Sequence, residues 1–332
     1  MRRFDYASPA TIDDALALLA GGDGAVRPLA GGTDLLTLMK ADIATPERLI
    51  DIKRLAELDD AIALDADGLS IGALATLDDL EDDPLVRQLA PALAEAAAAA
   101  ASPQLRNMAT IGGNLLQRPR CWYFRSSLVH CWLKGGTECQ ARDGENALHA
   151  LFDQSPCVAV HPSDLATALV ALDASVRLRG PAGERSLSLG EFFAPPTDDR
   201  RTENVLAPDE LILSVRIPPP ADNARGTYLK AMDRKVWAFA LVGVAATVAR
   251  DGDRIGAARI VLGGVAQTPW RAREAEDLLV GQRPDADLFA RAADAALAGA
   301  APLADNGYKI PLARTLIRRA LAAVTADGAP PA

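Results

Sequence analysis

Short runs of strand character alternate with helical segments at the start of the chain. Residues 26–30 and 49–52 predict strands, and residues 34–40 predict a short helix directly after a Gly-Gly pair. Residues 10–19 predict a helix with Pro9 near its start, because proline is favoured at early helical positions. This pattern predicts a small α/β unit.

The next part of the chain shows the same alternation over a longer distance. An Ala-rich segment, residues 89–101, contains Pro91 and Glu95 and predicts a helix with small side chains. The apolar runs of strand length are residues 69–71, 158–160, 174–178 and 211–217. Together these elements indicate a mixed α+β region.

Pro218, Pro219 and Pro220 mark a boundary, because consecutive prolines continue neither a helix nor a strand ladder. Beyond them, the expected elements are strands at 227–231, 240–249 and 255–262, then helices from about 271, from about 287 and over 312–324. We therefore predict three units: residues 1–55, residues 56–218 with an inserted segment at 117–160, and residues 222–326.

Composition and charge exclude two classes of protein. The 332 residues are 49% hydrophobic and 24% charged, as in ordinary globular proteins. The net charge of −9 and the pI of about 5.0 argue against a nucleic-acid-binding surface. The apolar stretch 237–249 is too short to span a bilayer, so we expect no membrane span.

The N-terminus bears on localisation. Arg2 and Arg3 resemble the start of a twin-arginine export signal, but Asp5, Asp13 and Asp14 stand where its apolar part would follow. The sequence therefore predicts a cytoplasmic protein, or a periplasmic one if a signal-bearing partner exports it.

Two Gly-Gly pairs have similar surroundings. Gly31-Gly32 and Gly112-Gly113 each follow a short apolar run and precede a hydroxyl or amide side chain and two apolar residues. Glycine lets the backbone approach a ligand closely, and exposed N–H groups before a helix bind phosphate oxygens. The pairs are either two cradles for one diphosphate or simple tight turns; Gly263-Gly264 is interpreted as a turn.

Five segments together resemble the FAD-binding subunits of the xanthine dehydrogenase family of molybdenum hydroxylases. The resemblance covers residues 3–325, and the segments that carry it are 29–36, 109–115, 161–165, 209–212 and 228–231. It implies a fold of the vanillyl-alcohol-oxidase type, with two N-terminal α+β subdomains that bind FAD and a C-terminal three-stranded sheet with helices. The three predicted units then correspond to these parts.

The resemblance also implies the residues that hold FAD. One side of the diphosphate would be wrapped by Pro28, Leu29, Ala30, Gly31, Gly32, Thr33, Asp34 and Leu35. The remaining implied contacts are Ala101, Thr110, Gly113, Asn114, Leu116, Ser163, Asp164, Ile212 and Lys230. Lys230 would lie near the isoalloxazine edge; the alternative is an ordinary solvated lysine.

All four cysteines, Cys121, Cys131, Cys139 and Cys157, fall within 37 residues of the inserted segment. Four thiolates are the usual ligands of an iron–sulfur cluster. Zinc is an alternative, although structural zinc sites favour closely spaced cysteine pairs, and none occurs here. Disulfides or unrelated thiols are a further alternative, which the missing export signal disfavours.

The segment between the second Gly-Gly pair and Ser163 resembles an insertion in the flavin subunits of 4-hydroxybenzoyl-CoA reductase and of periplasmic-type aldehyde oxidoreductases. Residues 117–125 are particularly similar to the aldehyde-oxidoreductase type. The resemblance implies that the four cysteines bind a [4Fe–4S] cluster. Arg118, Arg120 and Arg125 would pair with phosphate or a partner, or remain solvated.

We therefore expect an electron-transferring FAD subunit of a heterotrimeric molybdenum hydroxylase that oxidises aldehydes or N-heterocycles. The resemblance implies a large molybdenum-cofactor subunit, a small subunit with two [2Fe–2S] clusters, and an external acceptor such as ferredoxin or a quinone. No catalytic residue is expected in this chain. The alternatives are a stand-alone FAD-dependent oxidoreductase with a zinc or structural-thiol loop, and a zinc-stapled binding protein.

Overall fold

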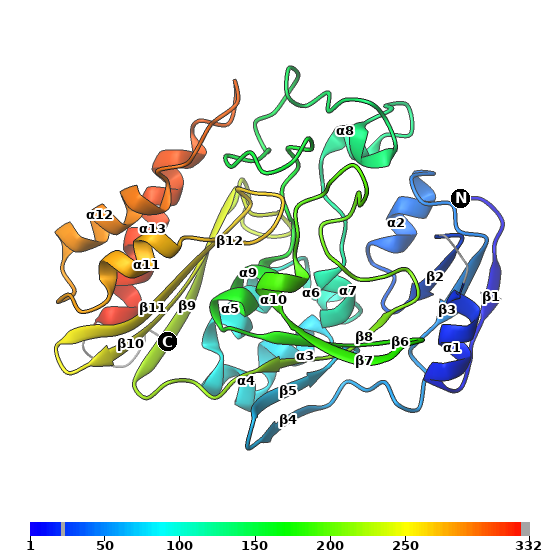
Figure 1. Ribbon diagram of the computed structural model, residues 1–332, viewed down its shortest axis with the longest axis horizontal. Helices are drawn as coiled ribbons and strands as arrows, with labels where there is room; N and C mark the ends of the chain where they lie inside the picture. Colours follow the sequence, from blue (N-terminus) through cyan, green and yellow to red (C-terminus); the bar gives the residue numbers. More distant parts are fainter. Residues whose placement is uncertain (21–23, 327–332) are drawn as a thin grey trace.

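The computed structural model describes residues 1–20 and 24–326 and contains three β-sheets (Figure 1). Each of the three predicted ranges contributes the strands of one sheet. The inserted segment, with α8, lies above the middle of the molecule in Figure 1, between α2 and the C-terminal helices.

The first sheet is parallel and has the order β1-β3-β2. Its elements are β1 (Asp5–Ala7), α1 (Ile12–Leu19), β2 (Val26–Leu29), α2 (Leu35–Lys40) and β3 (Arg48–Asp51). The predicted start of the first helix is wrong. The helix begins at Ile12 rather than near Pro9, because the Thr11 side chain accepts a hydrogen bond from the Asp14 N–H and caps it there.

The second sheet is antiparallel, with the order β4-β5-β8-β6-β7. Its strands are β4 (Ile62–Asp65), β5 (Gly68–Gly72), β6 (Ser175–Gly180), β7 (Gly183–Ser188) and β8 (Leu211–Ile217). The helices of this part are α3 (Leu77–Asp82), α4 (Pro84–Leu89), α5 (Pro91–Ala99), α6 (Pro103–Arg106), α7 (Ile111–Leu115), α9 (Asp164–Ala171) and α10 (Leu189–Phe192).

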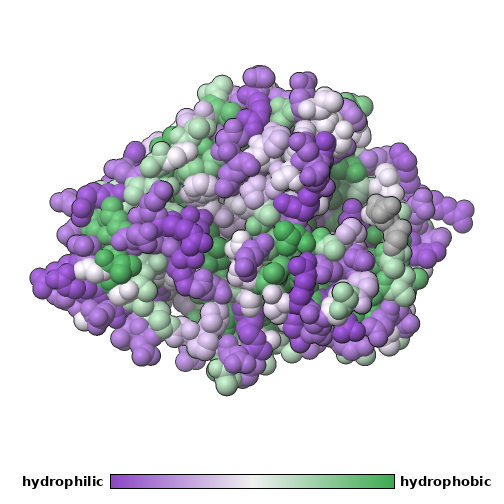
Figure 2. Space-filling model, in the orientation of Figure 1, coloured by the Kyte–Doolittle hydropathy of each residue, from purple (hydrophilic) through white to green (hydrophobic). Residues whose placement is uncertain are grey.

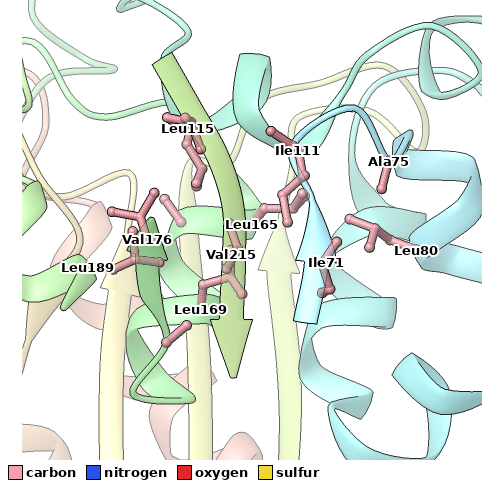
Figure 3. Close-up of a cluster of buried hydrophobic side chains, with 14 of the residues drawn as sticks. Ile71, Ala75, Leu80, Ile111, Leu115, Leu165, Leu169, Val176, Leu189 and Val215 are labelled. Atoms are coloured by element: carbon pink, nitrogen blue, oxygen red, sulfur yellow. The ribbon is translucent and has the colours of Figure 1, made fainter. Parts of the chain in front are cut away.

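Helix α9 is central to the core. In Figure 3, its Leu165 and Leu169 lie among Ile71, Val176 and Val215 of the second sheet. Its other side packs against β10 and β11 of the third sheet. All eight residues of α9 are buried, as expected for a helix enclosed on every side.

The third sheet has the order β12-β11-β10-β9. It contains β9 (Ala224–Ala231), β10 (Val242–Asp251), β11 (Arg254–Gly263) and the two-residue β12 (Trp270–Arg271), which adds a short edge to the three expected strands. The covering helices are α11 (Arg273–Leu279), α12 (Ala286–Ala296) and α13 (Lys309–Thr325). Helix α13 begins before the predicted residue 312, because Pro311 is tolerated in its first turn.

The inserted segment has little regular structure. It contains α8 (Trp122–Arg125) and a 3₁₀ turn (Trp132–Lys134). The strand predicted at residues 158–160 is wrong: these residues form no ladder. The apolar run reflects burial in a loop, since Val158 and Ala159 are both buried. The Val158 carbonyl accepts a hydrogen bond from the Ala150 N–H.

The described helices agree with the expectation that the chain has no membrane span. Within residues 1–20 and 24–326, no helix is both long and apolar enough to cross a membrane. Figure 2 shows a mostly hydrophilic face on which apolar residues occur in separate small groups.

Candidate cofactor site

The backbone of the first Gly-Gly pair touches the segment that leads into the second pair. A Cβ built on Gly31 would lie 1.6 Å from the carbonyl oxygen of Met108, which precedes the second pair. Only glycine permits this approach. Gly32 has φ +70°, the left-handed conformation that side chains disfavour.

The two pairs differ in what their backbones offer a ligand. Among the described residues, the N–H groups of residues 31–34 meet no acceptor, so they are free to bind an anion. The N–H groups of Ile111, Gly112, Gly113 and Asn114 already donate to Ala75, Ala73 and Thr110. The N–H groups around the second pair are therefore engaged within the protein, and its part in binding a ligand stays a prediction.

Asp34 connects the first pair to the inserted segment. Its carboxylate accepts hydrogen bonds from the Arg118 backbone N–H at 2.9 Å and from the guanidiniums of Arg120 at 2.6 Å and Arg125 at 2.8 Å. Burial lowers the pKa of Arg120 to about 10, which leaves it charged at neutral pH. The two cations offset an acidic group that would otherwise repel phosphate.

The expectation that these arginines are solvated is therefore wrong. Arg118 also has a protein partner, since its guanidinium lies 3.0 Å from the carboxylate of the buried Glu203. Sequence reasoning could not find these pairs, because the partners of Arg118 lie more than 80 residues away along the chain.

Ser163 and Asp164 join the second pair to the third sheet. The Ser163 hydroxyl donates to Asn114 and caps α9 by accepting from the Ala166 N–H. The carboxylate of Asp164 accepts from the Tyr228 hydroxyl and, at 2.8 Å, from the Lys230 ammonium. Burial raises the pKa of Asp164, and the lysine opposes that rise.

Lys230 is not a solvated lysine. Its side chain is 2% exposed, and its ammonium also donates to the Ala99 carbonyl at 2.9 Å. Ala101, two residues further on, has φ +52°, an unusual value for a residue with a Cβ. Ile212 lies buried in β8, and Leu116 packs against the same core.

A cavity of about 350 Å³ opens beside Ser163 and Asp164. Its other walls come from the inserted segment and from two loops of the third sheet, and the residues of interest here are Cys121, Trp122, His149, Phe239 and Gly264. The sequence interpretation missed the loop 233–241 and took Gly263-Gly264 as a mere turn. Neither segment carries a recognisable ligand pattern, because the cavity arises only when three separate parts of the chain meet.

The four cysteines share one small apolar cluster. Cys131 and Cys157 are buried, Cys121 and Cys139 are half-buried, and Leu38, Phe124 and Trp132 pack with them. All four thiols are free, which does not support the disulfide alternative. A hydrogen bond from Cys157 lowers the pKa of Cys139 to about 6, while burial raises that of Cys121 to about 11.

The thiols do not converge on a single ion. In the part of the chain that the structure describes, no three His, Cys, Asp or Glu side chains are close enough to hold one metal ion. A mononuclear zinc site would need such convergence. Four thiolates are also the donor set of a multi-iron cluster, and the structure shows that the four cysteines belong to one apolar cluster.

Both parts of the chain match known families. Residues 2–220 match the FAD binding domain in molybdopterin dehydrogenase, and residues 227–324 match the CO dehydrogenase flavoprotein C-terminal domain. The chain belongs to the FAD-binding subunits of the molybdenum hydroxylases. The resemblance, the α+β fold class and the assignment to an oxidoreductase subunit are thereby confirmed.

Relatives of this FAD-binding subunit match along its whole length. The aldehyde oxidoreductase FAD-binding subunit PaoB of Escherichia coli K12 is 42% identical over 330 residues, 98% of each chain. The carbon monoxide dehydrogenase medium chain of Hydrogenophaga pseudoflava is 31% identical over 329 residues, also 98% of each. A solved structure of carbon monoxide dehydrogenase from that organism matches with a TM-score of 0.78, 30% identity and 97% coverage of both chains.

We expect Gly31→Ala to lose most bound FAD. The new Cβ would collide with the Met108 carbonyl, and separating the two backbones should weaken binding by about 2 kcal/mol, roughly 30-fold. FAD released from the purified protein measures the effect. Gly190→Ala is the matched control, because its Cβ would meet nothing closer than 3.9 Å. Normal FAD content in Gly31→Ala would contradict the shared site.

We expect His161 to make the fold acid-sensitive. Burial lowers its pKa to about 3, so the unfolded chain binds the extra proton as pH falls below about 6.5 and stability is lost between these values. From pH 7 to pH 5 this residue should cost about 2 kcal/mol. Urea unfolding of His161→Asn should show a correspondingly smaller loss, whereas the exposed control His130→Asn should follow the wild type. Equal losses in all three proteins would refute this assignment.

Proposed function

We propose that this chain carries the FAD of an aldehyde-oxidising molybdenum hydroxylase and passes electrons from partner [2Fe–2S] clusters to an external acceptor. The observation that carries the proposal is a set of three contacts that involve the predicted FAD residues. They are the Gly31–Met108 approach, the Asn114–Ser163 hydrogen bond and the buried Asp164–Lys230 pair. The 42% identity with an aldehyde oxidoreductase subunit favours aldehydes as the substrate class.

The free N–H groups of residues 31–34 would hold the FAD diphosphate, with Pro28, Leu29, Ala30 and Leu35 beside them. Thr110, Gly113, Asn114 and Leu116 would close the other side. The desolvated pair of Asp164 and Lys230 would form a charged edge for the ring system, and Ala101 and Ile212 would complete the predicted contacts. When bound, FAD supplies an electron carrier that links one-electron and two-electron partners.

We propose that Cys121, Cys131, Cys139 and Cys157 hold a [4Fe–4S] cluster. Their shared apolar pocket supports this donor set, and Phe124 and Trp132 exclude water from it. Such a cluster supplies one-electron transfer when bound. The wall that Cys121 shares with Ser163 and Asp164 favours a position close to the flavin.

The proposed partners are a large molybdenum-cofactor subunit and a small subunit with two [2Fe–2S] clusters. Two relatives are named as medium chains of carbon monoxide dehydrogenases, which supports a place between a larger and a smaller chain. The external acceptor would be a ferredoxin-like protein or a quinone. The substrate pocket would lie in the large partner, so we assign no catalytic residue here.

The first test counts cofactors in the anaerobically purified chain. We expect one FAD with about four iron and four acid-labile sulfide. Cys121→Ser should lose most iron but keep FAD, because the cradle at Gly31 does not use this thiol. Ser126→Ala, a change in the same segment, is the control. FAD without iron would remove the cluster but keep the flavin assignment, and a folded chain without FAD would remove both.

A second test concerns the partners. Native purification through a tag on this chain should recover two further chains, molybdenum and additional iron, together with aldehyde oxidation. By itself, the isolated chain should not reduce an acceptor with electrons from any aldehyde. Aldehyde oxidation by the FAD-loaded chain alone would instead support a stand-alone oxidoreductase.

A further inference from the structure

His149 lies between the proposed cluster and the cavity. Its imidazole is 2% exposed, and Nε2 lies 3.2 Å from the Sγ of Cys121. Nδ1 is buried and has no protein partner among the described residues. The indole N–H of Trp122, whose ring meets His149 edge-on at 5.4 Å, is likewise buried without a partner.

The C-terminal helix region holds His149 in place. The His149 carbonyl accepts from the Lys309 ammonium at 2.9 Å and from the Asn306 amide at 3.2 Å. Lys309 and Asn306 are completely buried, and Lys309 also donates to the Gly264 carbonyl at 2.8 Å. The backbone at His149 is therefore held by the third unit of the chain, while its ring packs against Trp122 of the same inserted segment that carries Cys121.

When the Cys121 thiol is a metal ligand, the donor and the acceptor of its hydrogen bond with His149 are fixed. A thiolate only accepts hydrogen bonds, so Nε2 must carry the proton and Nδ1 must be bare in a neutral ring. The bare Nδ1 belongs to a residue that lines the same cavity as Cys121, Ser163 and Asp164. His149 thus contacts one cysteine of the proposed cluster and also the space beside the proposed flavin residues.

We propose that His149 is a positioning residue that donates Nε2–H to the Cys121 thiolate and thereby raises the reduction potential of the cluster. This inference depends on the proposed [4Fe–4S] cluster. A reduced cluster places more negative charge on its sulfurs, so an N–H donor stabilises it more than the oxidised form. Nothing in this role requires His149 to bind iron.

The test compares two amide variants that differ in where they place the N–H. His149→Gln can present its amide near the position of Nε2, whereas His149→Asn reaches only the position of Nδ1. We expect Gln to keep the wild-type potential. At the wild-type midpoint potential, His149→Asn should lower the ratio of reduced to oxidised cluster about tenfold. For a one-electron couple this corresponds to a reduction potential about 59 mV lower.

The measurement is an anaerobic redox titration followed by electron paramagnetic resonance, with iron, sulfide and FAD counted on each sample. The exposed His130, which precedes Cys131, provides the control variant His130→Asn, whose potential should not move. Equal potentials in wild type, Gln and Asn, with four iron in each, would overturn the role of His149 alone. A wild type without iron would overturn the cluster and this inference together, while the FAD count would still test the flavin site.

Discussion

The arrangement of the site depends on the ion pairs that the Asp34 carboxylate forms with Arg120 and Arg125. The carboxylate stands beside four free N–H groups that suit an anion, and an uncompensated acid there would oppose phosphate binding. Arg120 and Arg125 supply the compensation, and both belong to the inserted segment. The insertion is therefore part of the wall of the first cradle. Removing either the acid or its cations would leave a partly buried charge unpaired, which costs far more than an exposed pair contributes.

A second buried ion pair, Asp164 with Lys230, joins the second and third units of the chain. Asp164 begins α9 in the second unit, and Lys230 lies in β9 of the third, so their contact fixes the two units to each other. Tyr228 and the Ala99 carbonyl satisfy the remaining polar atoms, which is the condition under which a buried ion pair is tolerated. Since the proposed flavin ring would lie at this junction, the same pair would fix both the domain arrangement and the charge around the cofactor.

Much of this could be predicted from local sequence, and the failures share one cause. Gly31-Gly32 indicated a close backbone approach, and the long apolar runs of β8, β10 and β11 indicated strands, because these signals depend on neighbouring residues. The run at 158–160 has the same composition but is buried by a loop instead of a ladder. The second Gly-Gly pair resembles the first, yet its N–H groups already donate within the protein, that of Gly112 to Ala73 and that of Gly113 to Thr110. The partners of the Asp34 carboxylate lie more than 80 residues away, and Lys309 lies 160 residues from His149, so composition and spacing could not reveal them.

The inserted segment raises the question of what holds it together. Its core contains few apolar residues, and two short helical turns give it little regular structure. Two free thiols, Cys131 and Cys157, are buried in that core, and the other two pack against it. Thiols pack as small hydrophobic groups, but four of them bury much less apolar surface than leucines would. A cluster bound there would supply cross-links among four distant points of the chain, as metal sites do in small domains. Folding of the segment and binding of the cluster would then be coupled. The contacts of the segment with Asp34 and with Lys309 lie outside the group of cysteines. They would therefore hold the segment in place before the cluster binds.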